Sequence, residues 1–142
     1  MTVAPAAVVS QRLNASTILD RNLEAGRAAD TALITADGRR VSYGELARLA
    51  AGVAGYLRDL GIEREQRVLM ILDDSPAFPA TFLGAMRIGA VPVPVNPMDR
   101  LDNYAYYLDD SYAKVVFVEA ALLPALEEEE RKARQLGQGT VT

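Results

Sequence analysis

The sequence predicts an α/β fold: a parallel-sheet unit of the order βαβαβα, preceded by a helix and a β-hairpin. Three short apolar runs have the composition of buried parallel strands, namely Val68–Leu72, Val91–Val95 and Val115–Val118. Each run is followed by a segment in which apolar residues recur at helical spacing. This alternation favours a parallel sheet with right-handed crossovers. Because three parallel strands are few for a finished domain, we expect part of a larger fold.

The composition excludes several classes of function. The chain has 142 residues, 50% hydrophobic and 24% charged, as in ordinary globular proteins. A net charge of −4 argues against a nucleic-acid partner. Cysteine and histidine are both absent, which excludes disulfides, thiolate nucleophiles and Ser-His-Asp triads. No basic leader stands at Met1–Ser10 and no apolar run reaches membrane-spanning length, so we expect a cytoplasmic protein without a membrane partner.

The first forty residues predict an arm, a helix and a hairpin. Residues 1–15 are rich in Ala and Val without a period, and we expect a loose arm. Ser16 or Thr17 is a suitable cap for a helix to about Arg27. The residues expected on its inner side are Ile18, Leu19, Leu23 and Ala28. The hairpin comprises a strand, a tight turn and a returning strand: Thr31–Thr35, Ala36–Arg39 and Arg40–Ser42.

A capping box opens the next helix. Ser42 would cap the third helical amide while Glu45 reaches back to the start of the helix, which runs to Leu60 and ends at Gly61. Its apolar residues fall on one wide face: Leu46, Leu49, Ala50, Val53, Ala54, Leu57 and Leu60. The helix also contains two glycines, each of which costs roughly 1 kcal/mol relative to Ala. We therefore expect close packing against another element at these glycines, Gly52 and Gly55.

The helix after the first parallel strand has two possible starts. Pro76 suits the first helical position if Ser75 is the cap, whereas a start at Phe78 with Pro79 first avoids a lost hydrogen bond. Four large residues line one side of this helix: Phe78, Phe82, Leu83 and Met86. Gly89 is placed to end it in the left-handed conformation.

The strand that follows Gly89 carries prolines at alternate positions. Pro92 and Pro94 lack N–H groups, and alternate residues of a strand direct these groups to the same side. One edge of the strand therefore has no donors, while Val91, Val93 and Val95 can pair on the other. Such a strand borders a gap, an irregular neighbour or a ligand crevice.

Two helices complete the prediction. Asp99 is the expected cap of the first, with Asp102 at its third position. Its apolar stripe is Leu101, Tyr104, Ala105 and Leu108, with Tyr107 beside it and Tyr106 exposed. The last helix spans Ala120 to about Gln135, with three expected i,i+4 pairs: Glu127/Arg131, Glu128/Lys132 and Glu130/Arg134. Residues 16–136 would form the partial domain, and residues 137–142 a disordered tail or a truncation point.

Three stretches, taken in order, resemble the N-terminal region of the acyl-activating superfamily of acyl- and aryl-CoA synthetases, adenylation domains and luciferases. Val41–Leu46 is similar to its Tyr-x-Glu-Leu helix start, and Leu60–Pro76 to its Leu-Gly…Asp-x-Val…Asn-Ser-x-Glu segment. Gly84–Pro97 is similar to its helix-Gly-Ala-Val-Pro-Val-x-Asn-Pro element. The likeness spans Thr17 to about Leu126. Asn103–Ser111 further resembles the tyrosine-bearing helix of the benzoate–CoA ligase branch.

The resemblance implies the first part of the large domain of an ATP-dependent, AMP-forming acid–CoA ligase that acts on an aromatic acid such as benzoate. The complete enzyme would use ATP, Mg²⁺ and CoA, and would pass through an acyl-adenylate. The family's phosphate-binding loop, which ends in Lys, has no counterpart here, because Gly137–Thr140 lacks the Lys. The family's ribose-binding Asp region and C-terminal catalytic Lys are missing too. We therefore expect an N-terminal fragment, natural or not, without catalytic residues or a cofactor of its own, and inactive by itself.

Two groups of residues are candidates for ligand contacts. Asp73 and Asp74 end a strand and could bind Mg²⁺, but the following strands end at Asn96 and Glu119 instead of an acceptor Asp. Capping of the next helix is therefore the preferred interpretation of the acidic pair, and no metal site is expected.

The second group follows Asn96-Pro97. In some aryl-CoA ligases the next residue is basic and contacts the nucleotide phosphates of CoA. That position is Met98 here, and Arg100 lies close enough to take a similar place. The resemblance thus implies a possible CoA contact at Met98 or Arg100, while a solvated arginine at a helix start is the preferred interpretation of Arg100. For Arg87, next to a helix end, a favourable interaction with the helix dipole is a sufficient explanation.

Other functions remain open at this point. The same superfamily includes adenylation enzymes that load a carrier protein. A noncatalytic truncation that binds or regulates a partner is a rival from another class. A receiver-like signalling domain is disfavoured by the missing acceptor Asp. Because a bare strand edge is a template for another chain, we also expect a homo-oligomer.

Overall fold

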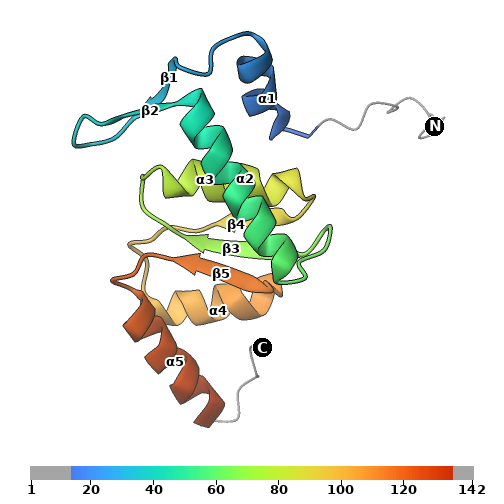
Figure 1. The fold of residues 1–142 in the computed structure, drawn as a ribbon. Coiled ribbons are helices and arrows are strands. Elements are labelled where there is room, and N and C mark those ends of the chain that lie inside the picture. Colours follow the sequence, from blue (N-terminus) through green and yellow to red (C-terminus); the bar gives the residue numbers. More distant parts are fainter. Residues whose placement is uncertain (1–13, 136–142) are drawn as a thin grey trace, which may run out of the picture.

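The computed structural model describes residues 14–135 (Figure 1). The helices and strands, in chain order, are α1 (Thr17–Glu24), β1 (Thr31–Ile34), β2 (Arg40–Ser42), α2 (Tyr43–Asp59), β3 (Arg67–Ile71), α3 (Ala77–Arg87), β4 (Val91–Pro94), α4 (Leu101–Ser111), β5 (Val115–Val118) and α5 (Leu123–Gln135). This order confirms the predicted helix, hairpin and βαβαβα unit. Most of the predicted arm, up to residue 13, and the predicted tail at 137–142 lie outside the described residues.

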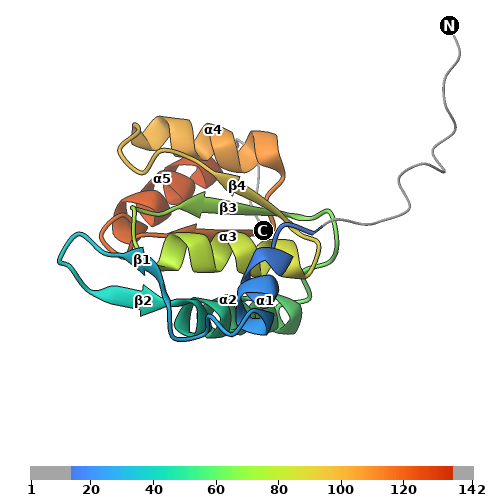
Figure 2. The same cartoon turned by 90° about the horizontal axis from the view of Figure 1, so that it is seen from above.

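The three later strands form a parallel sheet in the order β4-β3-β5. Because β3 is central, the connection from β3 to β4 and that from β4 to β5 run in opposite directions across the sheet. Crossovers of one hand that run in opposite directions lie on opposite faces. Accordingly, α2 and α3 cover one face and α4 and α5 the other (Figure 2). The chain therefore diverges to the two faces at the carboxyl ends of the strands.

The central strand alone is fully enclosed. Val68, Leu69, Met70 and Ile71 have no exposed surface (0% each), as expected for a strand covered on both faces. The same expectation was wrong for the outer strands, because β4 and β5 are the two edges of the sheet. Val91 is 38% exposed, and all four residues of β5 are half-buried.

The edge strand β4 pairs on one side only. Val91 and Val95 each donate a backbone hydrogen bond of 2.9 Å toward β3. Pro92 and Pro94, at the alternate positions, therefore face away from β3, and the outer edge of β4 lacks their donors. This confirms the prediction of a strand that pairs through its valines.

α3 ends as predicted but begins between the two predicted starts. Its first residue is Ala77, so Pro79 occupies the third helical position, where an N–H would have no intrahelical partner. At the other end, Gly89 has a φ of 82°. The backbone N–H of Gly89 donates to Met86 (3.0 Å) and that of Ala90 to Ala85 (3.1 Å), the two bonds of a Schellman end.

The predicted capping box is half right. Ser42 Oγ accepts a hydrogen bond of 3.1 Å from the backbone N–H of Glu45, which fixes the start of α2. The Glu45 carboxylate, however, accepts a bond from the Arg39 guanidinium on the hairpin instead of reaching back. Arg39 lies in the turn of the confirmed antiparallel hairpin, and its charge outcompetes a neutral backbone donor.

The two glycines of α2 do not mark a close contact, contrary to the prediction. A Cβ built on Gly52 or Gly55 would meet no atom within 4 Å apart from the adjacent residues and the backbone of α2 itself. The close approach lies instead on α3, where a Cβ on Gly84 would stand 2.7 Å from Ala50 O and 2.8 Å from Val53 Cβ. The α2–α3 contact thus depends on a missing side chain in the partner helix.

Several predicted inward residues point outward. Ile18 is 56% exposed, Leu49 39% and Leu60 49%, and Ala28 is exposed as well. α1 also ends at Glu24, before the predicted Arg27. The predicted faces were too wide because helical spacing gives the direction of a side chain, whereas the packed neighbours decide how broad the buried stripe is.

Ser16 occupies the N-cap position of α1, as predicted, but its side chain makes no cap bond. Asn14 Oδ1 accepts a bond of 3.0 Å from Ser16 N, and Asn14 Nδ2 donates to Met86 O on α3 at 2.7 Å. Asn14 therefore holds the start of α1 against α3.

The last helix begins at Leu123, three residues later than predicted. Two of its three predicted i,i+4 pairs, Glu127/Arg131 and Glu128/Lys132, are replaced by pairs of another spacing. The ion pairs are i,i+3, between Glu128 and Arg131 and between Glu129 and Lys132. The side chains of the expected Glu130/Arg134 pair lie outside the described residues. Among the residues described, no helix combines the length and the apolar character needed to cross a membrane.

Candidate functional site

The carboxyl ends of the parallel strands form the candidate site. The chain leaves β3 for α3 on one face, and leaves β4 and β5 for α4 and α5 on the other (Figure 1). In open α/β sheets, ligands bind where neighbouring connections diverge in this way. Three segments meet the criterion: Asp73–Pro76 after β3, Val95–Arg100 after β4, and Glu119 after β5.

The acidic pair after β3 neither caps a helix nor gathers a metal set. The N-cap position of α3 is Pro76, without a side-chain cap bond, and no acidic residue lies in the first turn, so the capping interpretation of Asp73 and Asp74 was wrong. The backbone N–H of Asp73 donates to Glu119 Oε1 at 3.0 Å, which joins the ends of β3 and β5. No cluster of three or more acidic, histidine or cysteine residues suited to a metal occurs between residues 14 and 135.

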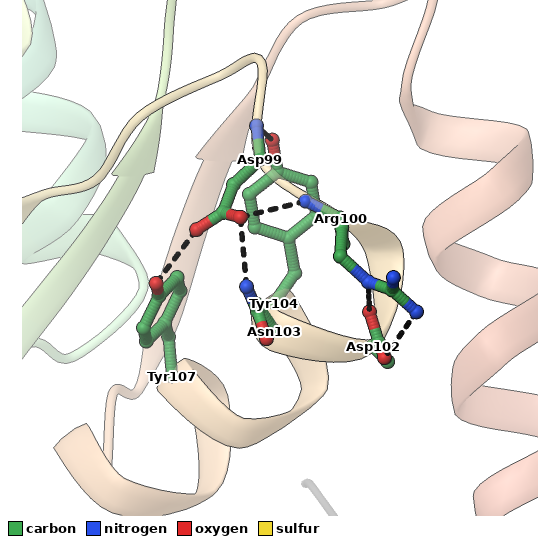
Figure 3. Close-up of polar contacts among 6 residues, drawn as sticks. All are labelled: Asp99, Arg100, Asp102, Asn103, Tyr104 and Tyr107. Atoms are coloured by element: carbon green, nitrogen blue, oxygen red, sulfur yellow. Dashed lines mark hydrogen bonds and ion pairs between the residues drawn. The ribbon is translucent and has the colours of Figure 1, made fainter.

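The loop after β4 is held by hydrogen bonds from its own residues and from α4. Asn96 Oδ1 accepts a bond of 2.9 Å from Met98 N, which makes a compact Asx turn. The hydroxyl of Tyr104 donates to Asn96 O at 2.9 Å and accepts from Asp99 N at 3.0 Å. Tyr104 is 1% exposed, so a buried residue of α4 fixes the loop from beneath (Figure 3).

The Asp99 carboxylate is the second anchor of this loop. It accepts bonds from Arg100 N (2.8 Å), Asn103 Nδ2 (2.7 Å) and the Tyr107 hydroxyl (2.7 Å). These donors, Tyr107 foremost, hold the pKa of Asp99 below its usual value. The same bond raises the pKa of Tyr107, because the proton is shared with a carboxylate.

Asp99 is not the helix cap that the sequence predicted. The cap position belongs to Arg100, which makes no side-chain cap bond, and α4 begins at Leu101. Asp99 stands one residue earlier and binds side chains of the first two turns instead of the third helical amide. The reason is that Asn103 and Tyr107, one turn apart on α4, present two donors to the same carboxylate (Figure 3).

The two residues expected to contact CoA stand on the outside of this loop. Met98 is 86% exposed, and the side chain of Arg100 is 80% exposed. Arg100 forms two bonds of 3.1 Å, from Nε to Asp102 Oδ1 and from Nη2 to Asp102 Oδ2 (Figure 3). This pair raises the pKa of Arg100 and lowers the pKa of Asp102.

Sequence reasoning placed the tyrosines of α4 correctly but missed what their hydroxyl groups do. Tyr104 is in the core, Tyr107 lies at its margin and Tyr106 is 62% exposed, as predicted. The bonds to Asn96 and Asp99 were not foreseen. The signal that could have found them is the spacing of Tyr104 and Tyr107 on one face of a helix whose start is an Asn-Pro turn.

Arg87 also has a more specific partner than the helix dipole. Its Nη2 donates to Asp20 Oδ1 of α1 at 2.9 Å, and both side chains are about one-third exposed (34% and 37%). The bond joins α1 to the end of α3. The dipole account was therefore incomplete, although the helix end does lie there.

A shallow pocket of about 210 Å³ lies between the hairpin and the start of α3. Its walls are mostly apolar and include Ile34 and Phe78, with Asp74 and Ser75 among the polar members. The pocket is open to solvent and holds no convergent set of charged groups. Its geometry points to no specific chemistry.

Comparison with known proteins agrees with this architecture. The family model described as AMP-binding enzyme matches residues 19–142. A 4-hydroxybenzoate–CoA/benzoate–CoA ligase from Rhodopseudomonas palustris is 43% identical over 110 residues, which are 78% of this chain and 20% of the relative. A benzoate–CoA ligase from Thauera aromatica is 39% identical over 122 residues, 84% of this chain and 23% of the relative.

Solved structures give the same result. The benzoate CoA ligase of Burkholderia xenovorans LB400 superposes with a TM-score of 0.75 at 37% identity, covering 82% of this chain and 23% of that one. The anthranilate CoA ligase AuaEII, in complex with anthranoyl-AMP, gives a TM-score of 0.79 at 32% identity and covers 91% of this chain and 24% of that one. The chain spans about a fifth of the length of these relatives. It belongs to the AMP-binding enzyme family, the acyl-activating superfamily, and corresponds to the N-terminal part of its large domain.

Proposed function

We propose that this chain is the N-terminal part of an AMP-forming acid–CoA ligase whose substrate is benzoate or a related aromatic acid. The observation that carries the proposal is the 43% identity to a benzoate-type ligase over 78% of the chain. The resemblance of Asn103–Ser111, on α4, to the tyrosine-bearing helix of benzoate–CoA ligases supports the same substrate class. ATP and CoA are available in the cytoplasm, where we place the reaction.

The proposed reaction has two steps. A carboxylate oxygen of the acid attacks the α-phosphorus of ATP, the bond from that phosphorus to the bridging oxygen breaks, and pyrophosphate leaves. The sulfur of CoA then attacks the acyl carbon, and the carbon–oxygen bond to AMP breaks. AMP carries the oxygen away, and the thiol proton passes to solvent. Mg²⁺ would offset phosphate charge, but residues 14–135 offer no ligand set for it, so no step is assigned to the ion here.

The contribution that we assign to this chain is a contact with the nucleotide part of CoA. Met98 and Arg100 project from the loop at the carboxyl edge of the sheet. A guanidinium has five N–H donors in a planar fork, and Asp102 uses two of those of Arg100. The remaining donors can bind a phosphate oxygen while the pair with Asp102 holds the fork in place.

We also propose that the 142-residue chain does not form an adenylate by itself. The sequence has no Gly-rich loop ending in Lys that would cradle the phosphates of ATP. Supplied with benzoate and ATP, the isolated chain should give no benzoate-dependent exchange of labelled pyrophosphate into ATP. Exchange above the level without acid would show that it carries an active site of its own.

The decisive experiment uses the complete enzyme that carries these residues. Benzoate, hydroxybenzoates, a fatty acid and an amino acid are each supplied with ATP, and pyrophosphate exchange identifies the acid that is activated. CoA and a carrier protein are then compared as acceptors, with the thioester identified by mass spectrometry. Benzoyl-CoA supports the proposal. Transfer to the carrier alone would indicate a carrier-loading enzyme, and no activation of any acid would favour a binding or regulatory role.

A further inference from the structure

We propose that Tyr104 and Tyr107 are positioning residues for the thiol-transfer step, because their hydroxyl groups hold the Asn96–Arg100 loop in the shape that presents Met98 and Arg100 to the nucleotide of CoA. The inference rests on the proposed function for its ligand. The positioning itself rests on hydrogen bonds within the described residues, of which Figure 3 shows the one from Tyr107 to Asp99.

Tyr104 fixes the backbone of the loop. Its ring is buried among Leu69, Ile71 and Leu126 of the core on the α4 side of the sheet. Its hydroxyl donates a hydrogen bond to Asn96 O at 2.9 Å and accepts one from Asp99 N at 3.0 Å. These two backbone groups lie at the two ends of the turn, so one phenol oxygen sets the distance between them.

Tyr107 fixes the same turn through a side chain. Its hydroxyl donates to Asp99 Oδ2 at 2.7 Å, while Asp99 Oδ1 accepts from Arg100 N at 2.8 Å. A carboxylate with a donor on each oxygen cannot rotate without losing one of them. The bond of Tyr107 therefore restrains Arg100, the residue that points outward next to Asp99.

The exposed and buried sides of this loop divide its roles. Met98 is 86% exposed and the Arg100 side chain 80% exposed, and within residues 14–135 only Asp102 pairs with that guanidinium. The loop lies at the edge where connections diverge to the two faces, the usual ligand position of such sheets. Two tyrosines thus support a segment whose outer residues face solvent, which is the arrangement needed to preorganise a binding loop.

Helix α4 supplies a matched control. Tyr106 lies on the same helix and is 62% exposed, and none of the hydrogen bonds within residues 14–135 involves its hydroxyl. Tyr106→Phe removes the same atom as Tyr104→Phe and Tyr107→Phe without touching the loop. All three variants keep the aromatic ring, so the packing of the core is retained.

The first measurement is amide hydrogen exchange at Asp99, and it requires no ligand. Tyr104→Phe should speed exchange at this amide roughly tenfold, because the bond to the phenol oxygen is lost and the remaining bond to Asn96 O is long, at 3.3 Å. Tyr106→Phe should leave it unchanged. Equal exchange in wild type and Tyr104→Phe would overturn the positioning role.

The second measurement uses the complete enzyme and separates the two half-reactions. Tyr104→Phe and Tyr107→Phe should raise the KM for CoA several-fold and leave pyrophosphate exchange within about twofold of wild type. A merely structural defect would lower both half-reactions together, and that result would overturn the inference. So would an unchanged KM for CoA in both variants when Arg100→Ala raises it. If Arg100→Ala itself has no effect on CoA, the proposed CoA contact fails, while the exchange result still decides whether the tyrosines hold the loop.

Discussion

The contact between α2 and α3 and the loop between β4 and α4 are specified in opposite ways. The helices meet through an absent side chain, since Gly84 lets α3 approach Ala50 and Val53 of α2 to distances that a Cβ could not tolerate. The loop is specified by polar groups that are present: the Tyr104 hydroxyl makes two hydrogen bonds and the Asp99 carboxylate accepts three. The helix contact depends on steric fit, and the conformation of the loop depends on its hydrogen-bond partners.

This difference predicts how each region responds to change. A packed contact has no room, so an added methyl group forces backbone or side chains to move. A hydrogen-bonded loop exchanges its partners for water when one is removed, at a net cost near 1 kcal/mol per bond. We therefore expect substitutions in the helix contact to change folding stability strongly, and substitutions in the loop to change local order.

The largest effect should come from Gly84→Ala. Alanine favours helices by about 1 kcal/mol over glycine, yet its Cβ would lie 2.7 Å from Ala50 O. Overpacking against a backbone atom costs on the order of 3 kcal/mol, so we expect net destabilisation of about 2 kcal/mol in denaturant unfolding. A variant as stable as wild type would show that α2 and α3 separate freely.

Gly89→Val should have an effect of similar size. Its φ of 82° lies in a region that β-branched residues avoid, and its Cβ would also stand 3.0 Å from Arg64 Cγ. The expected loss in unfolding free energy is about 1–3 kcal/mol. Gly89→Asn, which tolerates this conformation better, is the control and should lose less. Equal losses for Val and Asn would assign the effect to Arg64 instead of the backbone.

Gly52→Ala should act in the opposite direction and thereby test the comparison within one pair of helices. Apart from the adjacent residues and the backbone of α2 itself, no atom lies within 4 Å of the built Cβ, so only the helix propensity changes, and we expect stabilisation of about 1 kcal/mol. The thermal midpoint should rise by a few degrees. A lower midpoint would mean that α2 has a close neighbour that the described residues do not include.

The smallest effect should be the pH dependence of the loop. The pKa of Asp99 lies below its ordinary value of 3.8, chiefly because of the Tyr107 hydroxyl. A carboxyl group with a lowered folded pKa contributes stability above its unfolded pKa and loses it as the pH falls through the folded pKa. Tyr107→Phe should therefore raise the pKa of Asp99 toward 3.8, measured by a carbon-13 titration of the carboxyl shift. Tyr106→Phe should leave that titration unchanged.

Structural features that follow from the backbone properties of a single residue could be predicted from the sequence. The left-handed end at Gly89 and the one-sided pairing of Pro92 and Pro94 were predicted from single residues and confirmed. Gly84 was missed because a close approach depends on which helix lies opposite, and periodicity carries no such information. Gly52 and Gly55 were misassigned for the same reason.

The candidate site was predicted only in outline. The buried Tyr104 and the exposed Arg100 follow from local patterns. The role of Asp99 does not, because its partners Asn103 and Tyr107 compete with the helix amide that a cap would bind. Such a competition is decided by side-chain geometry within one turn of helix, which a sequence pattern does not encode.

The prolines of β4 determine at which edge of the sheet a further strand can pair. On the outer edge of β4, Pro92 and Pro94 offer carbonyl oxygens without the alternating N–H groups that a new strand requires. β5 has no proline, so the corresponding N–H groups remain on its outer edge. Further strands, including one from a second copy of the chain, would add beside β5. We expect sedimentation equilibrium to show self-association that a proline in β5 weakens, whereas a compact monomer at tens of micromolar would contradict it. Pro92 and Pro94 thus prevent regular strand pairing at the β4 edge and leave the β5 edge available for it.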